Sequence, residues 1–144
     1  MTATALAHRS VRLMAKSNQI KFVVITPERQ VLEETTDSVI FSAHDGEIGI
    51  LHDRAPLMCE LGIGQLRYHA GSQTRRLFID GGFAQVNENT VTILTPHALL
   101  AEDITAETVA EAERSVEELR GTDPETLEAR TKAQRRLSVL RGLQ

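Results

Sequence analysis

The chain has 144 residues, of which 41% are hydrophobic, so it can bury the core of one ordinary domain or of a smaller domain with an appendage. Its formal net charge is −4, which argues against nucleic acid as the main partner, because proteins that bind nucleic acid usually carry a basic surface. The single cysteine excludes an intramolecular disulfide, and no apolar run approaches the ~20 residues that span a bilayer, so we expect membrane contact only through partner proteins.

Residues 1–19 contain three basic residues, Arg9, Arg12 and Lys16, and no acid. We predict that they form a disordered extension, because chain termini are usually loosely held. Two alternatives stay open. The composition is also typical of an organelle transit peptide, and Met14 could be the true first residue.

Residues 20–100 show the pattern of antiparallel β structure, in which short runs of β-branched residues alternate with turn residues. Most of the nine glycines fall between Gly46 and Gly82. We expect strands at 20–26, 31–42, 46–51, 57–61, 65–70, 74–80, 83–86 and 90–95. Many short strands with closely spaced turns predict an N-terminal antiparallel β-sandwich or a flattened barrel.

Residues 101–144 are rich in Ala, Glu, Arg and Leu and predict two α-helices that form an antiparallel hairpin. The first helix, over 106–120, is predicted by an apolar stripe at helical spacing: Val109, Ala112, Val116 and Leu119. Gly121 fits a left-handed C-terminal cap of this helix. Asp123 and Pro124 fit the N-cap and the first position of the second helix.

Both predicted helices have narrow apolar stripes in which alanine fills several positions. At ~25 cal/mol per Å² of buried apolar surface, such a hairpin gains too little to be stable on its own. We therefore expect it to dock on another surface or to open, as a mobile, switch-like element.

The densest group of possible metal ligands is His44, Asp45, Glu47, His52 and Asp53. Five such residues within ten positions would suit a metal-dependent enzyme. No pair has a helical i, i+4 spacing and no metalloprotease signature is present, so we favour ordinary turn residues around a short strand.

Two other segments invite a chemical interpretation. Asp-Gly-Gly-Phe at 80–83 lacks the spacing of a dinucleotide-binding loop and no helix follows it, so we expect a tight bend or bulge between strands. Cys59 lies in an apolar run, and we expect a small buried side chain rather than a nucleophile.

The C-terminal end of the chain carries five basic residues and no acid: Arg130, Lys132, Arg135, Arg136 and Arg141. Such a cluster is usually a solvated helix face. The alternative is docking to an acidic protein surface, where complementary charge gives specificity and fast association.

Segment 46–57 reads GEIGILHDRAPL, and GIGQLR follows it a few residues later. Segment 80–86 reads DGGFAQV, VTIL stands at 91–94, and AEDI at 101–104 precedes the predicted helices. In this order and at this spacing, the motifs resemble the epsilon-subunit family of F-type ATP synthases, from residue 20 to about residue 141.

The resemblance implies a β-sandwich and a helical hairpin in a non-catalytic subunit of the central stalk. The sandwich would lie between the gamma subunit and the ring of c subunits, with Glu47, Arg54, Pro56 and Leu57 as candidate contacts. The hairpin would fold on the sandwich or extend toward the catalytic alpha and beta subunits, where it would suppress ATP hydrolysis. The five C-terminal basic residues would then face an acidic segment of beta.

Two positions depart from the family pattern. Arg54 stands where the family commonly has histidine, which changes the contact with gamma but keeps a polar group. Some members bind ATP on the hairpin through an I-D-x-x-R-A segment, whereas here Thr105 and Thr108 replace both charged residues. A triphosphate would lack its arginine, so we expect weak or no ATP binding and assign no cofactor.

The resemblance and the bacterial character of the last helix imply a peripheral location on the cytoplasmic side of a bacterial inner membrane. An organellar inner membrane is the less favoured alternative. Two other functions stay open: a metal-binding enzyme built on the cluster from His44 to Asp53, and an adaptor that uses the same β-domain on another scaffold.

Overall fold

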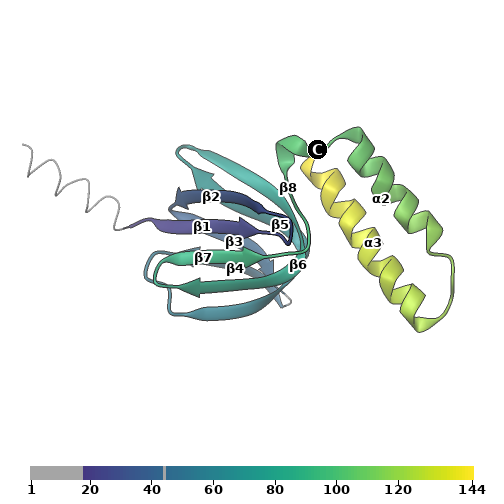
Figure 1. Cartoon of the computed structure of the whole chain (residues 1–144), viewed down its shortest axis with the longest axis horizontal. Coiled ribbons are helices and arrows are strands. Elements are labelled where there is room, and N and C mark those ends of the chain that lie inside the picture. The colour runs from purple at the N-terminus through teal and green to yellow at the C-terminus, as the bar shows by residue number, and fades with distance from the viewer. Residues whose placement is uncertain (1–17, 44) are drawn as a thin grey trace, which may run out of the picture.

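The computed structural model describes residues 18–43 and 45–144, so nearly all of the predicted extension over 1–19 lies outside the described residues. A β-domain and a helical hairpin follow each other along the chain and lie side by side (Figure 1). This confirms the predicted fold class, an N-terminal β-sandwich followed by two C-terminal helices. None of the described helices has the length and apolar character that a membrane span requires.

Eight strands form the β-domain, in the spatial order β2-β1-β7-β6-β5-β3-β4, with β8 paired to β6. Their bounds are β1 Ile20–Ile25, β2 Gln30–Thr36, β3 Ser38–Ala43, β4 Gly46–Leu51, β5 Leu57–Ala70, β6 Gln73–Asn87, β7 Thr90–Leu94 and β8 Ala98–Leu100. Neighbouring strands are antiparallel, except β1 and β7, which are parallel. The predicted antiparallel pairing therefore holds for every pair but one.

Several predicted strand boundaries were wrong. The expected strand at 31–42 is two strands, β2 and β3, because the chain bends at Asp37. The four strands expected between 57 and 86 are two long strands, β5 and β6, which pair along almost their whole length. A continuous ladder of hydrogen bonds carries both strands through glycines that look like breaks in the sequence.

Gly81 and Gly82 mark the place at which β6 changes neighbours, from β8 before them to β7 after them. Both residues have a positive φ, 73° and 105°, and a Cβ atom on Gly82 would collide with the carbonyl oxygen of Leu94. The bend that the sequence predicts is therefore present, but it lies inside one strand rather than between two.

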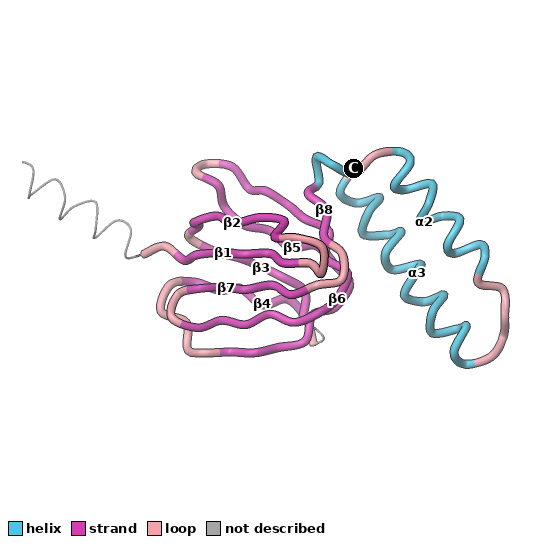
Figure 2. The backbone as a smooth tube through the Cα atoms, viewed as in Figure 1, coloured by secondary structure: helices cyan, strands magenta, loops and turns pink. Residues whose placement is uncertain are grey.

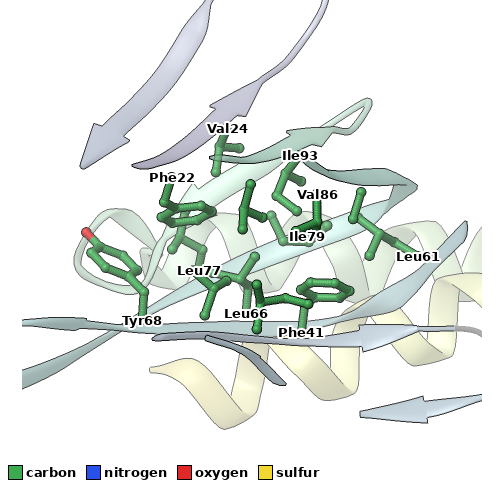
Figure 3. Packing of buried hydrophobic residues seen from close by; sticks show 14 of the residues in the cluster. Phe22, Val24, Phe41, Leu61, Leu66, Tyr68, Leu77, Ile79, Val86 and Ile93 are labelled. Carbon is green, nitrogen blue, oxygen red and sulfur yellow. The ribbon is translucent and has the colours of Figure 1, made fainter. Parts of the chain in front are cut away.

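The core of the sandwich is built from side chains that meet between its two faces. In Figure 3, Phe22 and Ile93 lie across the core from Phe41, Leu66 and Tyr68, and none of the five is more than 1% exposed. The rings of Phe22 and Tyr68 pack with their centroids 5.1 Å apart, a favourable aromatic contact. This core makes the sandwich a firm platform for the surfaces described below.

The hairpin begins with the short helix η1 (Ala101–Asp103), followed by α2 (Ala106–Glu118) and α3 (Pro124–Leu143). Asp123 caps α3 as predicted, because its carboxylate accepts hydrogen bonds from the backbone N–H and the Oγ1 hydroxyl of Thr126 (3.1 and 2.7 Å).

The predicted left-handed cap at Gly121 is wrong. Helix α2 ends at Glu118, and the φ of Gly121 lies outside the left-handed region. The guanidinium of Arg130 instead donates to the carbonyl oxygens of Leu119 and Gly121. A side chain from α3 thus satisfies carbonyl groups that a glycine cap would otherwise leave to backbone donors.

Helix α3 lies between the sandwich and α2, with one side against β5 and β6 (Figure 2). A second apolar cluster forms where the hairpin meets the sandwich: Phe78, Ile104, Val109, Leu140 and Leu143. The expectation that the hairpin docks on another surface is confirmed, and that surface belongs to the same chain.

Candidate interaction surfaces

Three of the four predicted contact residues lie together where β4 leads into β5: Arg54 and Pro56 are in the loop, and Leu57 is the first residue of β5. Arg54 and Pro56 are exposed, whereas Leu57 is half-buried against the sandwich core. The backbone N–H of Asp53 donates to Oδ1 of Asn89 (2.7 Å), and the N–H of Lys21 donates to the carbonyl of Asn89. These bonds place the loop beside the start of β1, at the end of the sandwich away from the helices (Figure 1).

Glu47, the fourth predicted contact residue, does not lie with the other three. It stands near the start of β4, whereas the loop follows the other end of that strand. Its carboxylate accepts two hydrogen bonds from the guanidinium of Arg67, at 3.2 and 3.3 Å. The structure therefore places Glu47 in a separate polar contact on β4 and β5.

An exposed apolar patch lies on the outer face of the sandwich and was missed from the sequence. It consists of Met58, Phe83 and Leu94, whose side chains are 66%, 52% and 46% exposed. Phe83 pairs directly with Leu94 across β6 and β7 and with Glu60 across β5 and β6, so Met58 lies diagonally beside it. Strand alternation could have revealed Phe83, since its neighbour Ala84 is buried.

The group of possible metal ligands does not come together among the described residues. There, no three His, Cys, Asp or Glu side chains are placed to hold a metal ion. His52 Nδ1 contacts the carboxylate of Asp53 (3.1 Å), while Glu47 binds Arg67. His44 lies outside the described residues.

Cys59 is half-buried, and burial raises the pKa of its thiol. A thiol that resists deprotonation is a poor nucleophile at neutral pH. Its side chain packs against the sandwich core, but it is half-buried rather than buried as the sequence led us to expect.

The basic residues of α3 are engaged within the chain rather than simply solvated. Arg136 Nε donates to Oδ1 of Asp80 (2.8 Å), and Arg135 Nε donates to the carbonyl oxygen of Ile63 (3.1 Å). Arg130 and Arg141 bind groups on α2 or just after it. Lys132 makes a long contact with Glu128 (3.8 Å) in which both side chains are mostly exposed.

A cavity of about 400 Å³ lies between the helices and the sandwich. Its polar lining includes Asp80, His97, Glu111 and Arg136, so its fixed charges are of both signs. Thr108, which also lines it, forms a reciprocal capping box with the residue that precedes α2. The Thr108 N–H donates to Thr105 Oγ1 (3.2 Å) and the Thr105 N–H donates to Thr108 Oγ1 (3.3 Å).

Comparison with known families bears directly on this arrangement of sandwich and hairpin. A sequence model described as "ATP synthase, Delta/Epsilon chain, beta-sandwich domain" matches residues 19–101. The chain belongs to this family. The matched region contains all eight strands and ends within η1, at the start of the hairpin.

Relatives that carry the name ATP synthase epsilon chain match over most of their own length. One from Leptospira borgpetersenii is 37% identical over 111 residues, which cover 77% of this chain and 87% of the relative. One from Rhodopirellula baltica is 44% identical over 97 residues, covering 65% and 76%. The matches to this epsilon-family chain therefore cover about two thirds or more of its length and a larger share of each relative.

Two solved assemblies share the fold. A chain of the Euglena gracilis mitochondrial ATP synthase (OSCP/F1/c-ring) superposes with a TM-score of 0.73 at 24% identity, over 87% of this chain and 81% of that one. A chain of the Tetrahymena thermophila mitochondrial ATP synthase (central stalk/c-ring) gives a TM-score of 0.60 at 16% identity, over 89% and 96%.

Proposed function

We propose that this chain is a non-catalytic rotor subunit of a proton-translocating ATP synthase, in the central stalk that links gamma to the c-ring. Membership of the delta/epsilon family is the observation that carries the proposal. Relatives named ATP synthase epsilon chain support it, and the chains of similar fold come from assemblies titled F1/c-ring and central stalk/c-ring. The partners are gamma, the c-ring and the catalytic alpha and beta subunits.

The contact with gamma and the c-ring is proposed to use the loop carrying Arg54, Pro56 and Leu57 together with the apolar patch (Met58, Phe83, Leu94). The loop leads directly into β5, which carries Met58 of the patch. Burying three large apolar side chains at an interface contributes about 1.5–3 kcal/mol for each that becomes fully covered. Glu47 is a separate candidate contact, because it is already bound to Arg67.

The hairpin is proposed to act as a brake on ATP hydrolysis when it leaves the sandwich. The five basic residues Arg130, Lys132, Arg135, Arg136 and Arg141 would then dock on an acidic segment of beta. Within the docked conformation, Arg135 and Arg136 already have partners on the sandwich, so docking on the sandwich and docking on beta exclude each other.

ATP is not expected to act as a ligand of the hairpin. Thr105 and Thr108 cap α2, and they offer no positive charge for a triphosphate. Isothermal titration calorimetry of the whole chain with MgATP tests this, and a dissociation constant in the nanomolar or low-micromolar range would contradict it.

We propose that the chain is a peripheral protein, attached to the membrane through the complex. We place the chain on the cytoplasmic side of a bacterial inner membrane, with an organellar inner membrane as the alternative. Co-fractionation of the chain with washed inner-membrane vesicles, and its release when the F1 part is stripped off, would support this location.

An inhibition titration tests the proposed function. The chain is added to a catalytic F1 complex that contains gamma but lacks this subunit, and ATP hydrolysis is followed. A saturable fall in rate supports both the partner and the brake. A flat rate with binding to gamma supports a rotor subunit without a brake, and a flat rate without binding contradicts the rotor assignment.

A further inference from the structure

Three segments that are distant in the sequence meet at Asn89. This half-buried residue lies in the two-residue turn between β6 and β7. Its backbone carbonyl accepts a hydrogen bond from the N–H of Lys21 (2.9 Å), at the start of β1. Its side-chain Oδ1 accepts a hydrogen bond from the N–H of Asp53 (2.7 Å), in the loop between β4 and β5. Asn89 therefore ties the first strand to the loop that carries Arg54 and Pro56.

The turn itself favours asparagine or glycine at this position. Glu88 and Asn89 both have a left-handed backbone, with φ of 48° and 59°, and Asn87 pairs with Thr90 across the turn. Two left-handed residues between paired strands make a tight hairpin turn whose twist matches the strands, and Asn and Gly adopt it most readily. Glycine can therefore replace Asn89 without disturbing the turn, and only the side-chain acceptor is then lost.

The loop that Asn89 contacts has few constraints of its own. Within it, the N–H of Arg54 donates to the carbonyl of Leu51 (3.3 Å), and His52 Nδ1 contacts the carboxylate of Asp53 (3.1 Å). Asp53 has a φ of 65°, a left-handed conformation that is uncommon outside glycine. In the part of the chain that the structure describes, the bond to Asn89 is the one hydrogen bond that joins this loop to another segment. The conformation of the loop therefore depends on a side chain outside it.

We propose that Asn89 is a positioning residue for the surface that meets the partner subunits. It holds the β4–β5 loop in one conformation before binding, so that Arg54 and Pro56 are already presented. This rests on the proposed function, in which the loop contacts gamma and the c-ring. A loop that is ordered in the free chain loses less conformational freedom on binding, so affinity is gained without a further contact.

Amide exchange in the isolated full-length chain, followed by NMR, tests the first half of the proposal without any partner. In Asn89→Gly, the amide of Asp53 loses its acceptor and should exchange about ten-fold faster. The amide of Lys21 is the internal control, because its acceptor is a backbone carbonyl, which glycine retains. Asn89→Asp keeps an oxygen at the same place, so exchange at Asp53 should stay close to that of the original chain.

Binding to a catalytic F1 complex that contains gamma but lacks this subunit tests the second half. Asn89→Gly lowers the fraction of chains whose loop is ready to bind, so the dissociation constant should rise about three- to ten-fold. Asn89→Asp should restore most of the lost affinity. Arg54→Ala is the matched contact variant, because it should raise the dissociation constant and leave exchange at Asp53 unchanged. Urea unfolding verifies that the variants keep the stability of the original chain.

Several results would overturn the proposal. Unchanged exchange at Asp53 in Asn89→Gly would show that the side chain does not hold the loop, even if binding were weaker. Faster exchange at both Asp53 and Lys21 would show that the turn had opened instead. Faster exchange at Asp53 with an unchanged dissociation constant would show that loop order does not matter for binding, and an aspartate variant as weak as the glycine variant would exclude the acceptor as the cause.

Failure of the proposed function gives a different result. If the original chain does not bind the F1 complex, the rotor assignment is contradicted, and with it the role of the loop as a contact. The exchange rates of Asp53 and Lys21 still decide whether Asn89 holds the loop, because they are measured in the isolated chain.

Discussion

The sandwich and the hairpin of this chain are held by different kinds of interaction. In the sandwich, side chains from every layer of strands converge on one buried apolar cluster. In the hairpin, α2 buries a single residue, Val109, and the 20 residues of α3 bury Ala133, Leu140 and Leu143. The helices instead rely on hydrogen bonds from arginine side chains.

This contrast shows how one short chain can combine a stable part with a movable one. Apolar burial is additive over many residues, so no single change releases the sandwich. The position of the hairpin depends on a small apolar cluster and a few hydrogen bonds from arginine side chains, and such bonds can be exchanged for equivalent bonds elsewhere. Substitutions in the sandwich core should therefore lower the stability of the sandwich, whereas substitutions in the hairpin should mainly weaken its docking or its helices.

The largest effect is expected from Phe41→Ala in the sandwich core. Phe41 is 1% exposed, and removal of a buried aromatic side chain should lower the free energy of unfolding by about 3–5 kcal/mol. Urea unfolding followed by far-ultraviolet circular dichroism measures the change. Phe83→Ala is the matched control, because its exposed side chain should alter stability by less than about 0.5 kcal/mol.

A smaller and more local effect is expected from Leu140→Ala on α3. Leu140 is 5% exposed within the cluster that joins hairpin and sandwich, so its loss should weaken docking by about 2 kcal/mol. Native-state hydrogen exchange should show faster exchange in α3 with unchanged protection in β5 and β6. Equal loss of protection in those strands would contradict the division into two parts. Leu127→Ala, at a 44% exposed position, is the control.

Thr105→Ala should cost about 1 kcal/mol of α2 stability, because it removes the Oγ1 atom that accepts the hydrogen bond from the backbone N–H of Thr108. Exchange rates of the first-turn amides of α2 give the measurement. Thr105→Ser keeps the hydroxyl and should behave like the original chain. If the serine variant were as weak as the alanine variant, the cap would not be the cause.

The smallest effect is expected from acidification at Asp123. Hydrogen bonds from the Thr126 side chain and then from its backbone lower the pKa of the Asp123 carboxyl below the usual value of 3.8. A depressed folded-state pKa means that the cap stabilises α3 above that usual value and is lost as the pH falls through the lower, folded-state pKa. Backbone NMR of Thr126 between pH 5 and pH 2 follows the loss. Asp123→Asn keeps an acceptor but cannot titrate, so its Thr126 signal should not show this transition.

Local features of the fold were predictable, whereas pairings between distant segments were not. Asp123 and Pro124 identified the start of α3 because capping depends on residues within one turn. The four short strands expected between 57 and 86 became β5 and β6 because ladder pairing across the sheet overrides the local effect of glycine. The prediction of a left-handed cap at Gly121 was wrong for a related reason. Arg130 belongs to the other helix, α3, and it donates a hydrogen bond to the carbonyl oxygen of Gly121.

For the candidate surfaces, too, the sequence predicted what is local and missed what depends on contacts between distant segments. Arg54, Pro56 and Leu57 are neighbours in the sequence and lie together where β4 leads into β5, but Glu47 lies at the other end of β4. The basic cluster of α3 was visible in the composition, whereas its partners were not. No pattern in the sequence links Arg136 to Asp80, because their contact exists only after the sandwich and the hairpin have both formed.

The parallel pairing of β1 with β7 has a consequence for the synthesis of the chain. Lys21 pairs with Thr90, which is made 69 residues later. At a translation rate of roughly 5–20 residues per second, β1 waits about 3–14 s for this neighbour. Phe22 and Val24, fully buried in the finished protein, remain uncovered for that time. The nascent chain should therefore present a hydrophobic strand to ribosome-associated chaperones until β7 has emerged.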